Sequence, residues 1–339
     1  MIHSLPRLNL FATLLLMQVL LAPLCCCVAQ EAKSQTEEQQ SKAAASTAFV
    51  QEYSDAEVES YEFGMRIQCS GGYAKAVTGN APIPIAWPEQ EVELYEETKS
   101  NSIGKIRIKK LGKTASIMAF VVPVMRDGET SEAILRYRVK RRGTIYPDDT
   151  EQFSFAKKLS GPMKVYLKPS PFIDSREEQI VEIGKTISEK NKEESAWAQV
   201  EAIYSWVREH VRYKFDTQIH TCVEALESGH GDCEELSSLF IAICRSQGIP
   251  ARAVWVPGHT YPEFYLVDET GQGHWFPCEV TGDRHEFGER TDTRPILQKG
   301  DRFRTPVSGE WKRYVEAGLR AADATGALKV EHLMRKVEK

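Results

Sequence analysis

Residues 231–251, GDCEELSSLFIAICRSQGIPA, carry the strongest structural signal in this 339-residue sequence. Their apolar side chains recur at the i, i+3, i+4, i+7 and i+8 spacing of a helix with one buried face. These side chains are Leu236, Leu239, Phe240, Ile243 and Cys244. Asp232 and Glu235 have the spacing of a capping box that starts a helix, and Gly248 can end it. The pattern predicts a buried helix that begins near Asp232.

Cys233 is expected in the first turn of this helix, directly after Gly231 and Asp232. The unsatisfied N–H groups of a first turn carry partial positive charge, which favours a thiolate and lowers the pKa of a thiol. A cysteine taken at random within a helix is more often a small buried residue than a nucleophile. The position at the helix start, after a glycine, shifts that balance. We therefore predict that Cys233 is a nucleophile.

A nucleophile needs a base, and the strands after the helix supply a candidate. Strands are expected at 251–256, 259–267 and 274–280. If the last two form an antiparallel hairpin centred near Glu269, His259 is paired with Glu279 at its open end. A carboxylate beside an imidazole fixes its orientation and stabilises the imidazolium. We therefore predict that His259 and Glu279 act with Cys233, and Asp283 is a rival for the acid.

In their order along the chain, these motifs resemble the bacterial transglutaminase-like core. The motifs are Gly231 to Glu235, Gly248 to Arg252, Gly258-His259 with Glu263, and Trp275 with an acid four residues on. The resemblance covers roughly Ser175 to Arg304, and residues 84–92 with the strands after them resemble the β-rich domain that often precedes this core. It implies a papain-like architecture in which Cys233 is the nucleophile, His259 the general base and acid, and Glu279 the orienting residue.

The sequence departs from the pattern of that family at two positions. The family most often has Asp where this chain has Glu279, so a longer side chain must fit the same gap. The family commonly has Trp two residues after its His, whereas residues 259–262 are HTYP, which points to a bulged or edge strand. The backbone N–H of Cys233 is one expected oxyanion donor. Candidates for the second donor are Tyr213, His220 and His230.

The sequence predicts an α+β protein, in which a papain-like, transglutaminase-like core follows a β-sandwich-like domain. In the core, the helix that bears Cys233 is expected to pack on an antiparallel sheet. A capping box of Ser175 and Glu178 is expected to start the first core helix. The expected divisions are a signal peptide at 1–29, a disordered linker at 30–48, the β-rich domain at 49–171, the catalytic core at 172–305 and a helical tail at 306–339.

The first segment has the features of an export signal. Arg7 precedes an apolar run at 8–24, and residues 27–29 place small side chains at a cleavage site. We expect a mature chain that begins near Gln30, lies in the periplasm or outside the cell and is not stably inserted in a membrane. A lipid-anchored form is the alternative, because a cysteine after an apolar stretch can mark lipid attachment.

Five cysteines are left in the expected mature chain, an odd number for an oxidising compartment. One free thiol is then expected, and this suits Cys233 as the nucleophile. Cys222 and Cys278 could form a disulfide that flanks the cleft, or both could be core residues.

Charge and composition narrow the possible functions. The net charge of −5, from 43 Lys and Arg against 48 Asp and Glu, gives no electrostatic footprint for nucleic acid. His220, Cys222, His230 and Cys233 are all of ligand type, but their spacing is not that of a zinc site. We expect no cofactor and no metal.

Cysteine-dependent acyl transfer on peptide or isopeptide amides is the predicted function. Hydrolysis is favoured over cross-linking, because water needs no second binding site. Given export, the expected substrates are peptides, proteins or peptidoglycan peptides. One alternative is a catalytically inactive binding or assembly module of the cell envelope; another is acyl transfer from a thioester to a small amine.

Overall fold

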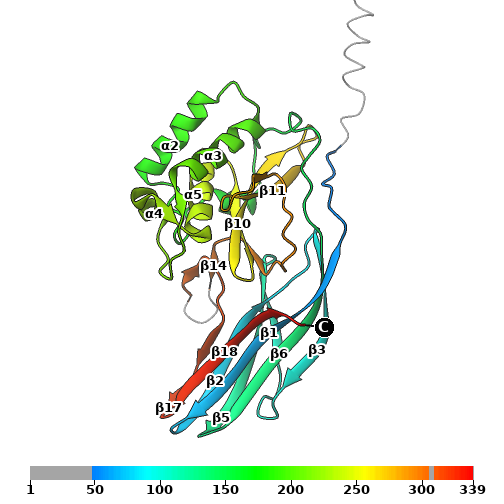
Figure 1. The fold of residues 1–339 in the computed structure, drawn as a ribbon, viewed down its shortest axis with the longest axis vertical. Helices are drawn as coiled ribbons and strands as arrows, with labels where there is room; N and C mark the ends of the chain where they lie inside the picture. The colour runs from blue at the N-terminus through cyan, green and yellow to red at the C-terminus, as the bar shows by residue number, and fades with distance from the viewer. Residues whose placement is uncertain (1–47, 305–308, 339) are drawn as a thin grey trace, which may run out of the picture. The chain divides into compact units, whose positions relative to one another are not determined.

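The computed structural model describes residues 48–304 and 309–338 (Figure 1). The expected signal peptide and all but the last residue of the expected linker lie outside the described residues. Within 48–304 and 309–338, no helix combines the length and the apolar character needed to cross a membrane.

The N-terminal region is built from long antiparallel strands. They are β1 (Glu57–Ser70), β2 (Tyr73–Ile83), β3 (Gln90–Lys99), β4 (Arg107–Leu111), β5 (Ala115–Arg126) and β6 (Thr130–Arg141). Strand β1 shows why they form a layered structure, since Met65, Ile67 and Cys69 are buried while Arg66 and Gln68 are exposed. One hydrophobic cluster combines the buried side chains of β1, β2, β5 and β6. Because β1 and β6 belong to a different sheet from β2 and β5, this region is a β-sandwich, as predicted.

The core begins after a short 3-10 helix, η1 (Met163–Leu167). Its helices are α2 (Glu178–Lys190), α3 (Ala196–His210), α4 (Cys222–Ser228) and α5 (Cys233–Ser246). Its antiparallel strands are β9 (Ala251–Val256), β10 (His259–Val267), β11 (Gly273–Glu279) and the short β12 (Glu286–Phe287). Helix α5 packs on β9 and β10, and nearly all of its residues after the first turn are buried. The predicted α+β fold, with a central helix on an antiparallel sheet, is confirmed.

A shared sheet joins the two regions. Strand β13 (Gln298–Lys299) pairs with β9 of the core and with β5 of the sandwich. The described residues therefore contain one ten-stranded sheet that runs from the core into the sandwich. Lys299 reinforces this joint, because its Nζ lies 2.6 Å from Glu89 Oε1 and 2.5 Å from Glu263 Oε1, and all three side chains are buried.

The prediction of a helical tail is wrong. The described part of the tail forms β15 (Trp311–Lys312), β16 (Gly318–Arg320), β17 (Asp323–Ala324) and β18 (Ala327–Lys336), and a short β14 (Phe303–Arg304) precedes it and pairs with β15. Strand β18 pairs along β1 from Tyr61 with Lys336 to Ser70 with Ala327 (Figure 1). The helix-favouring composition of the tail is overridden because the edge of β1 offers a ladder of backbone hydrogen bonds.

The predicted start of the first core helix is also wrong in its capping. Helix α2 begins at Glu178, but its N-cap is Glu177, which makes no side-chain capping hydrogen bond. Ser175 is buried two residues before that cap. The sequence spacing of a capping box was present, but the turn at 174–177 places the serine outside the helix start.

Candidate active site

Cys233 occupies the first position of α5, and its place is fixed by local contacts. The Asp232 Oδ1 accepts a 2.7 Å hydrogen bond from the backbone N–H of Glu234, and the Glu235 Oε2 accepts a 2.8 Å bond from the N–H of Asp232. These bonds make the predicted capping box. Cys233 is half-buried and lies beside the backbone of Thr260, the residue after His259.

The expectation of a lowered thiol pKa at this helix start is not met. Burial, together with the nearby carboxylates of Asp232, Glu279 and Glu235, raises the pKa of Cys233 to about 11, although a hydrogen bond from the Thr260 backbone acts in the opposite direction. Burial of the thiol, with the nearby carboxylates, thus outweighs the partial positive charge of the helix start. Without a proton acceptor the thiol stays neutral near pH 7.

His259 and Glu279 form the second half of the site. The Nε2 of His259 lies 2.8 Å from the Oε2 of Glu279, and both side chains are largely buried. The other oxygen of Glu279 accepts hydrogen bonds from the Thr281 hydroxyl at 2.5 Å and from the Thr281 backbone at 3.0 Å. Burial alone would raise the pKa of Glu279, but the hydrogen bond from His259 and the charge of Arg290 lower it to about 2. Glu279 is therefore an anion at any physiological pH.

The hairpin brings these two residues together in a register that differs from the predicted one. Val267 pairs with Gly273 instead of Gly271, because Asp268 closes a longer turn through bonds to the backbone of Thr270 and Gln272. A shift of two residues keeps every side chain on its predicted face of the sheet.

The hairpin ladder ends before it reaches the site. The last pair in the ladder is Glu263 with Pro277, and Glu279 pairs instead with Glu286 of β12. His259 and Glu279 thus meet where the two strands no longer pair, and the longer glutamate side chain closes the gap.

The structure also places the alternative acid, Asp283, and the three candidate oxyanion donors. Asp283 is exposed, and among the described contacts it is Glu279 that bonds His259. Of the candidate oxyanion donors, Tyr213 lies close enough for the charges of Cys233 and Asp232 to act on it. His220 Nε2 lies 3.8 Å from an Asp216 carboxylate oxygen, and His230 Nδ1 lies 2.9 Å from the carbonyl oxygen of Ser228.

The suggested zinc ligands and disulfide partners are not brought together. The part of the chain that the structure describes has no group of three or more residues placed to hold a metal ion. Its five cysteines are free, and only Cys233 among them is not fully buried. Cys222 contacts Asp174 instead of Cys278.

Two arginines at the site carried no signal in the sequence. Arg290 donates a hydrogen bond to Glu279, and its side chain is almost completely buried. Arg313, from the tail, forms an ion pair with Glu234 and packs its guanidinium over the ring of Trp255. Arg290 follows two irregular residues after β12, and Arg313 directly follows the two-residue strand β15. Segments this short show neither a periodicity nor a motif that marks a functional side chain.

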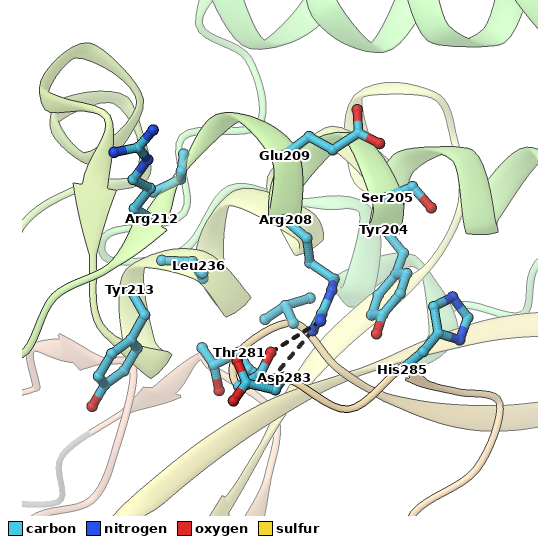
Figure 2. Close-up of a pocket in the computed structure, with 13 residues that line it drawn as sticks. Tyr204, Ser205, Arg208, Glu209, Arg212, Tyr213, Leu236, Thr281, Asp283 and His285 are labelled. Carbon is cyan, nitrogen blue, oxygen red and sulfur yellow. Dashed lines mark hydrogen bonds between the residues drawn. The ribbon is translucent and has the colours of Figure 1, made fainter.

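A pocket of about 540 Å³ flanks the site. It is lined by Leu236, one turn after Cys233, by Thr281, which bonds Glu279, and by Tyr213. Figure 2 shows Arg208 reaching across the pocket, where it donates to the carbonyl oxygens of Thr281 at 3.4 Å and Gly282 at 2.9 Å. Its Nη1 also donates to the carbonyl oxygen of Glu279 at 3.1 Å.

Comparison with known proteins agrees with this fold. Residues 182–280 match the family model of the Transglutaminase-like superfamily. No curated protein matches the sequence. Among solved structures, a protein of Cytophaga hutchinsonii that is provisionally named a cysteine protease aligns over 86% of this chain and 94% of its own, with 16% identity and a TM-score of 0.53. The periplasmic domain of TgpA from Pseudomonas aeruginosa aligns over 68% of this chain and 94% of its own, with 12% identity and a TM-score of 0.34.

At 16% identity, the Cytophaga hutchinsonii structure supports the fold alone, and the family model supports the segment that it matches. That segment runs from α2 to the end of β11 and holds Cys233, His259 and Glu279. This protein therefore carries a transglutaminase-like domain with the papain-like α+β fold, preceded by a β-rich region.

Proposed function

We propose that this protein is a cysteine-dependent acyl-transfer enzyme in which Cys233 is the nucleophile, His259 the general base and acid, and Glu279 the orienting residue. The observation that carries the proposal is the 2.8 Å hydrogen bond between His259 Nε2 and Glu279 Oε2, at the start of the strand whose next residue lies against Cys233. A buried carboxylate that orients an imidazole, one residue before the backbone that contacts a half-buried thiol, supports nucleophilic catalysis by that thiol.

The hydrogen bond to Glu279 leaves Nδ1 of His259 to accept the thiol proton. The sulfur of Cys233 then attacks the carbonyl carbon of the substrate, and the electron pair of the C=O bond moves to the oxygen. When the tetrahedral intermediate collapses, the C–N bond breaks and the imidazolium gives its proton to the leaving amine. A thioester between Cys233 and the acyl group is left.

Water completes the cycle in the favoured version of the reaction. His259 takes a proton from the water as its oxygen attacks the thioester, and the C–S bond breaks to release the acid. The imidazolium returns its proton to the sulfur, so Cys233 and His259 end neutral as they began. Glu279 stays ionised throughout and stabilises each imidazolium that forms.

The raised pKa of Cys233 assigns a specific task to this base. Because burial and the nearby carboxylates raise the pKa of the Cys233 thiol to about 11, the thiolate forms as its proton passes to His259 and not beforehand. We assign the backbone N–H of Cys233, at the first position of α5, as the first donor to the oxyanion that develops.

The proposed substrates are peptide or isopeptide amides of exported peptides, proteins or peptidoglycan. The pocket beside the site would take the side chain next to the reacting carbonyl, and its polar walls include Arg212 and Asp283. We also propose that the first 29 residues direct export, and that residues 49–171 and 172–305 act as one catalytic unit.

The test needs no substrate. Iodoacetamide labelling of the protein from pH 4 to pH 10, quantified by peptide mass spectrometry, reports on the five described thiols together. The buried Cys69, Cys222, Cys244 and Cys278 serve as internal controls. We expect Cys233 to react at neutral pH, far below its raised pKa of about 11. In the His259→Ala variant we expect the labelling rate of Cys233 to be lower by at least about tenfold. Equal rates in the two proteins would overturn the proposal and favour an inactive binding module.

A further inference from the structure

Arg290 shares an oxygen atom of Glu279 with His259. Its Nη1 donates to Oε2 of Glu279, and the same oxygen is 2.8 Å from Nε2 of His259. The Arg290 side chain is 4% exposed. One carboxylate oxygen is therefore held between the imidazole on one side and a buried guanidinium on the other.

The Arg290 side chain is itself fixed by several partners. Its Nη2 lies 2.9 Å from Asp292 Oδ2, and its Nη1 lies 3.4 Å from Glu286 Oε2. The guanidinium also stacks on the ring of Tyr261, with 4.3 Å between its central carbon and the ring centroid. A side chain with so many contacts has little freedom, so it can define where Glu279 lies.

The Arg290 backbone is held by the β-rich region. Its N–H donates to the carbonyl oxygen of Thr144 at 3.0 Å, and its carbonyl accepts from the N–H of Thr144 at 2.9 Å. Thr144 follows the last residue of β6 by three positions. Two hydrogen bonds thus connect the end of a sandwich strand to the residue that contacts the orienting acid.

We infer that Arg290 is a positioning residue, which holds Glu279 against His259 and makes the β-rich region a structural part of the active site. This inference rests on the proposed function, because it assigns a task to Arg290 within that reaction. Buried ion clusters also occur with a purely structural role, so the decisive evidence must come from the behaviour of His259.

The charge of Arg290 should affect the protonation of His259, and this effect can be measured. Arg290 neutralises part of the negative charge that Glu279 presents to His259, so it limits how strongly the imidazolium is favoured. Removal of Arg290 should let the imidazolium persist to higher pH. Among the described residues, the other charged or titratable groups near this pair include Cys233 of α5, Tyr204 and Arg208 of α3, Tyr261 of β10, Cys278 of β11, Glu286 of β12, and Asp292. Asp232, the N-cap of α5, and Glu235 act on the neighbouring Cys233.

The experiment follows the ring protons of His259 by NMR as a function of pH, in the full chain with Cys233→Ser so that the thiol does not titrate. Arg290→Gln and Arg290→Lys are compared with the parent. Arg245 provides matched controls, because it is a buried arginine 2.7 Å from Asp301 and has no contact with Glu279 among the described residues. Arg245→Gln and Arg245→Lys should therefore lower stability in a similar way.

We expect Arg290→Gln to raise the pH at which His259 loses its proton by roughly one unit, Arg290→Lys to raise it less, and the Arg245 variants to leave it unchanged. If Arg290→Gln does not fold, the comparison of the two lysine variants decides. The inference is overturned if the Arg290 variants shift His259 no more than the Arg245 variants do. That result would leave the proposed function intact, because the dependence of Cys233 labelling on His259 is measured separately with the thiol present.

Discussion

The two halves of the candidate site are held by different kinds of contact. Cys233 is placed by a capping box whose two carboxylates lie within two residues of it. Glu279 is placed by His259, twenty residues away, and by Arg290, whose own backbone bonds to Thr144. One half is built from neighbours in the sequence, and the other is assembled only when the whole chain has folded.

This difference has an energetic side. A cap exchanges hydrogen bonds with water at the protein surface and contributes about 1 kcal/mol. Removal of a buried carboxylate that balances a buried arginine costs much more, because it leaves an uncompensated buried charge. Substitutions should therefore have large effects at Glu279 and small ones at Asp232.

The largest effect is expected for Glu279→Ala. This change removes the carboxylate to which both Arg290 and His259 are hydrogen-bonded. We expect the free energy of unfolding to fall by about 3–5 kcal/mol, as when one partner of a buried ion pair is removed. Urea unfolding measures it. Asp283→Ala is the matched control four residues on, and because Asp283 is exposed it should change stability by less than about 0.5 kcal/mol. A similar loss in both variants would show that Glu279 is not held as described.

The half of the site that contains Glu279 should also make stability depend on acid pH. The pKa of Glu279 is lowered from 4.5 to about 2, so its folded-state contribution is fully present above pH 4.5 and is lost as the pH falls toward 2. The difference corresponds to about 3 kcal/mol. We expect the stability of the wild type to fall more steeply between pH 5 and pH 2 than that of Glu279→Gln. Parallel curves would contradict the depressed pKa.

Local signals explain what could be predicted from the sequence. The capping box, the buried stripe of α5 and the position of Cys233 depend on residues within one helix, and all three are found in the structure. The side chains of His259 and Glu279 are in contact although the predicted strand register was wrong, because a shift of two residues keeps each side chain on the same face of the sheet. The thiol pKa was predicted in the wrong direction. Burial of the site, which is the largest cause, and the distant carboxylate of Glu279 are invisible in the local motif, and the charges of Asp232 and Glu235 within the motif oppose the helix start.

Long-range partners explain what could not be predicted. Arg290 matters because Thr144 and Glu279 lie against it, and no pattern in the sequence around Arg290 indicates either contact. The tail was predicted as helix because its composition allows one, yet residues 327–336 complete a sheet with β1, more than 250 positions earlier in the chain. Such pairings are decided by which strand edges stay open after the rest has folded.

A smaller effect is expected for Thr281→Val. The hydroxyl of Thr281 donates at 2.5 Å to the oxygen of Glu279 that His259 does not use, and a hydrogen bond to a charged group contributes about 1.5–3 kcal/mol. We expect a stability loss at the lower end of this range, because the backbone N–H of Thr281 still donates to the same oxygen. Thr281→Ser keeps the hydroxyl and should retain most of the stability. If valine and serine are equivalent, the hydroxyl does not hold the acid.

The smallest effect is expected at the locally built half, for Asp232→Asn. Asparagine caps a helix as well as aspartate does, so α5 should be retained, while one of the charges that raise the pKa of Cys233 is removed. A decrease of about half a pKa unit would raise the iodoacetamide labelling rate at pH 8 roughly threefold.

The same variant should change how stability depends on pH. Burial and the neighbouring Glu235 raise the pKa of Asp232 itself to about 7. Its favourable contribution to stability is therefore fully present below pH 3.8 and is lost as the pH rises from 3.8 to 7, so the variant should gain stability relative to wild type over that range. If the labelling rate falls and stability falls with it, the carboxylate of Asp232 has a role in the reaction beyond that of a cap.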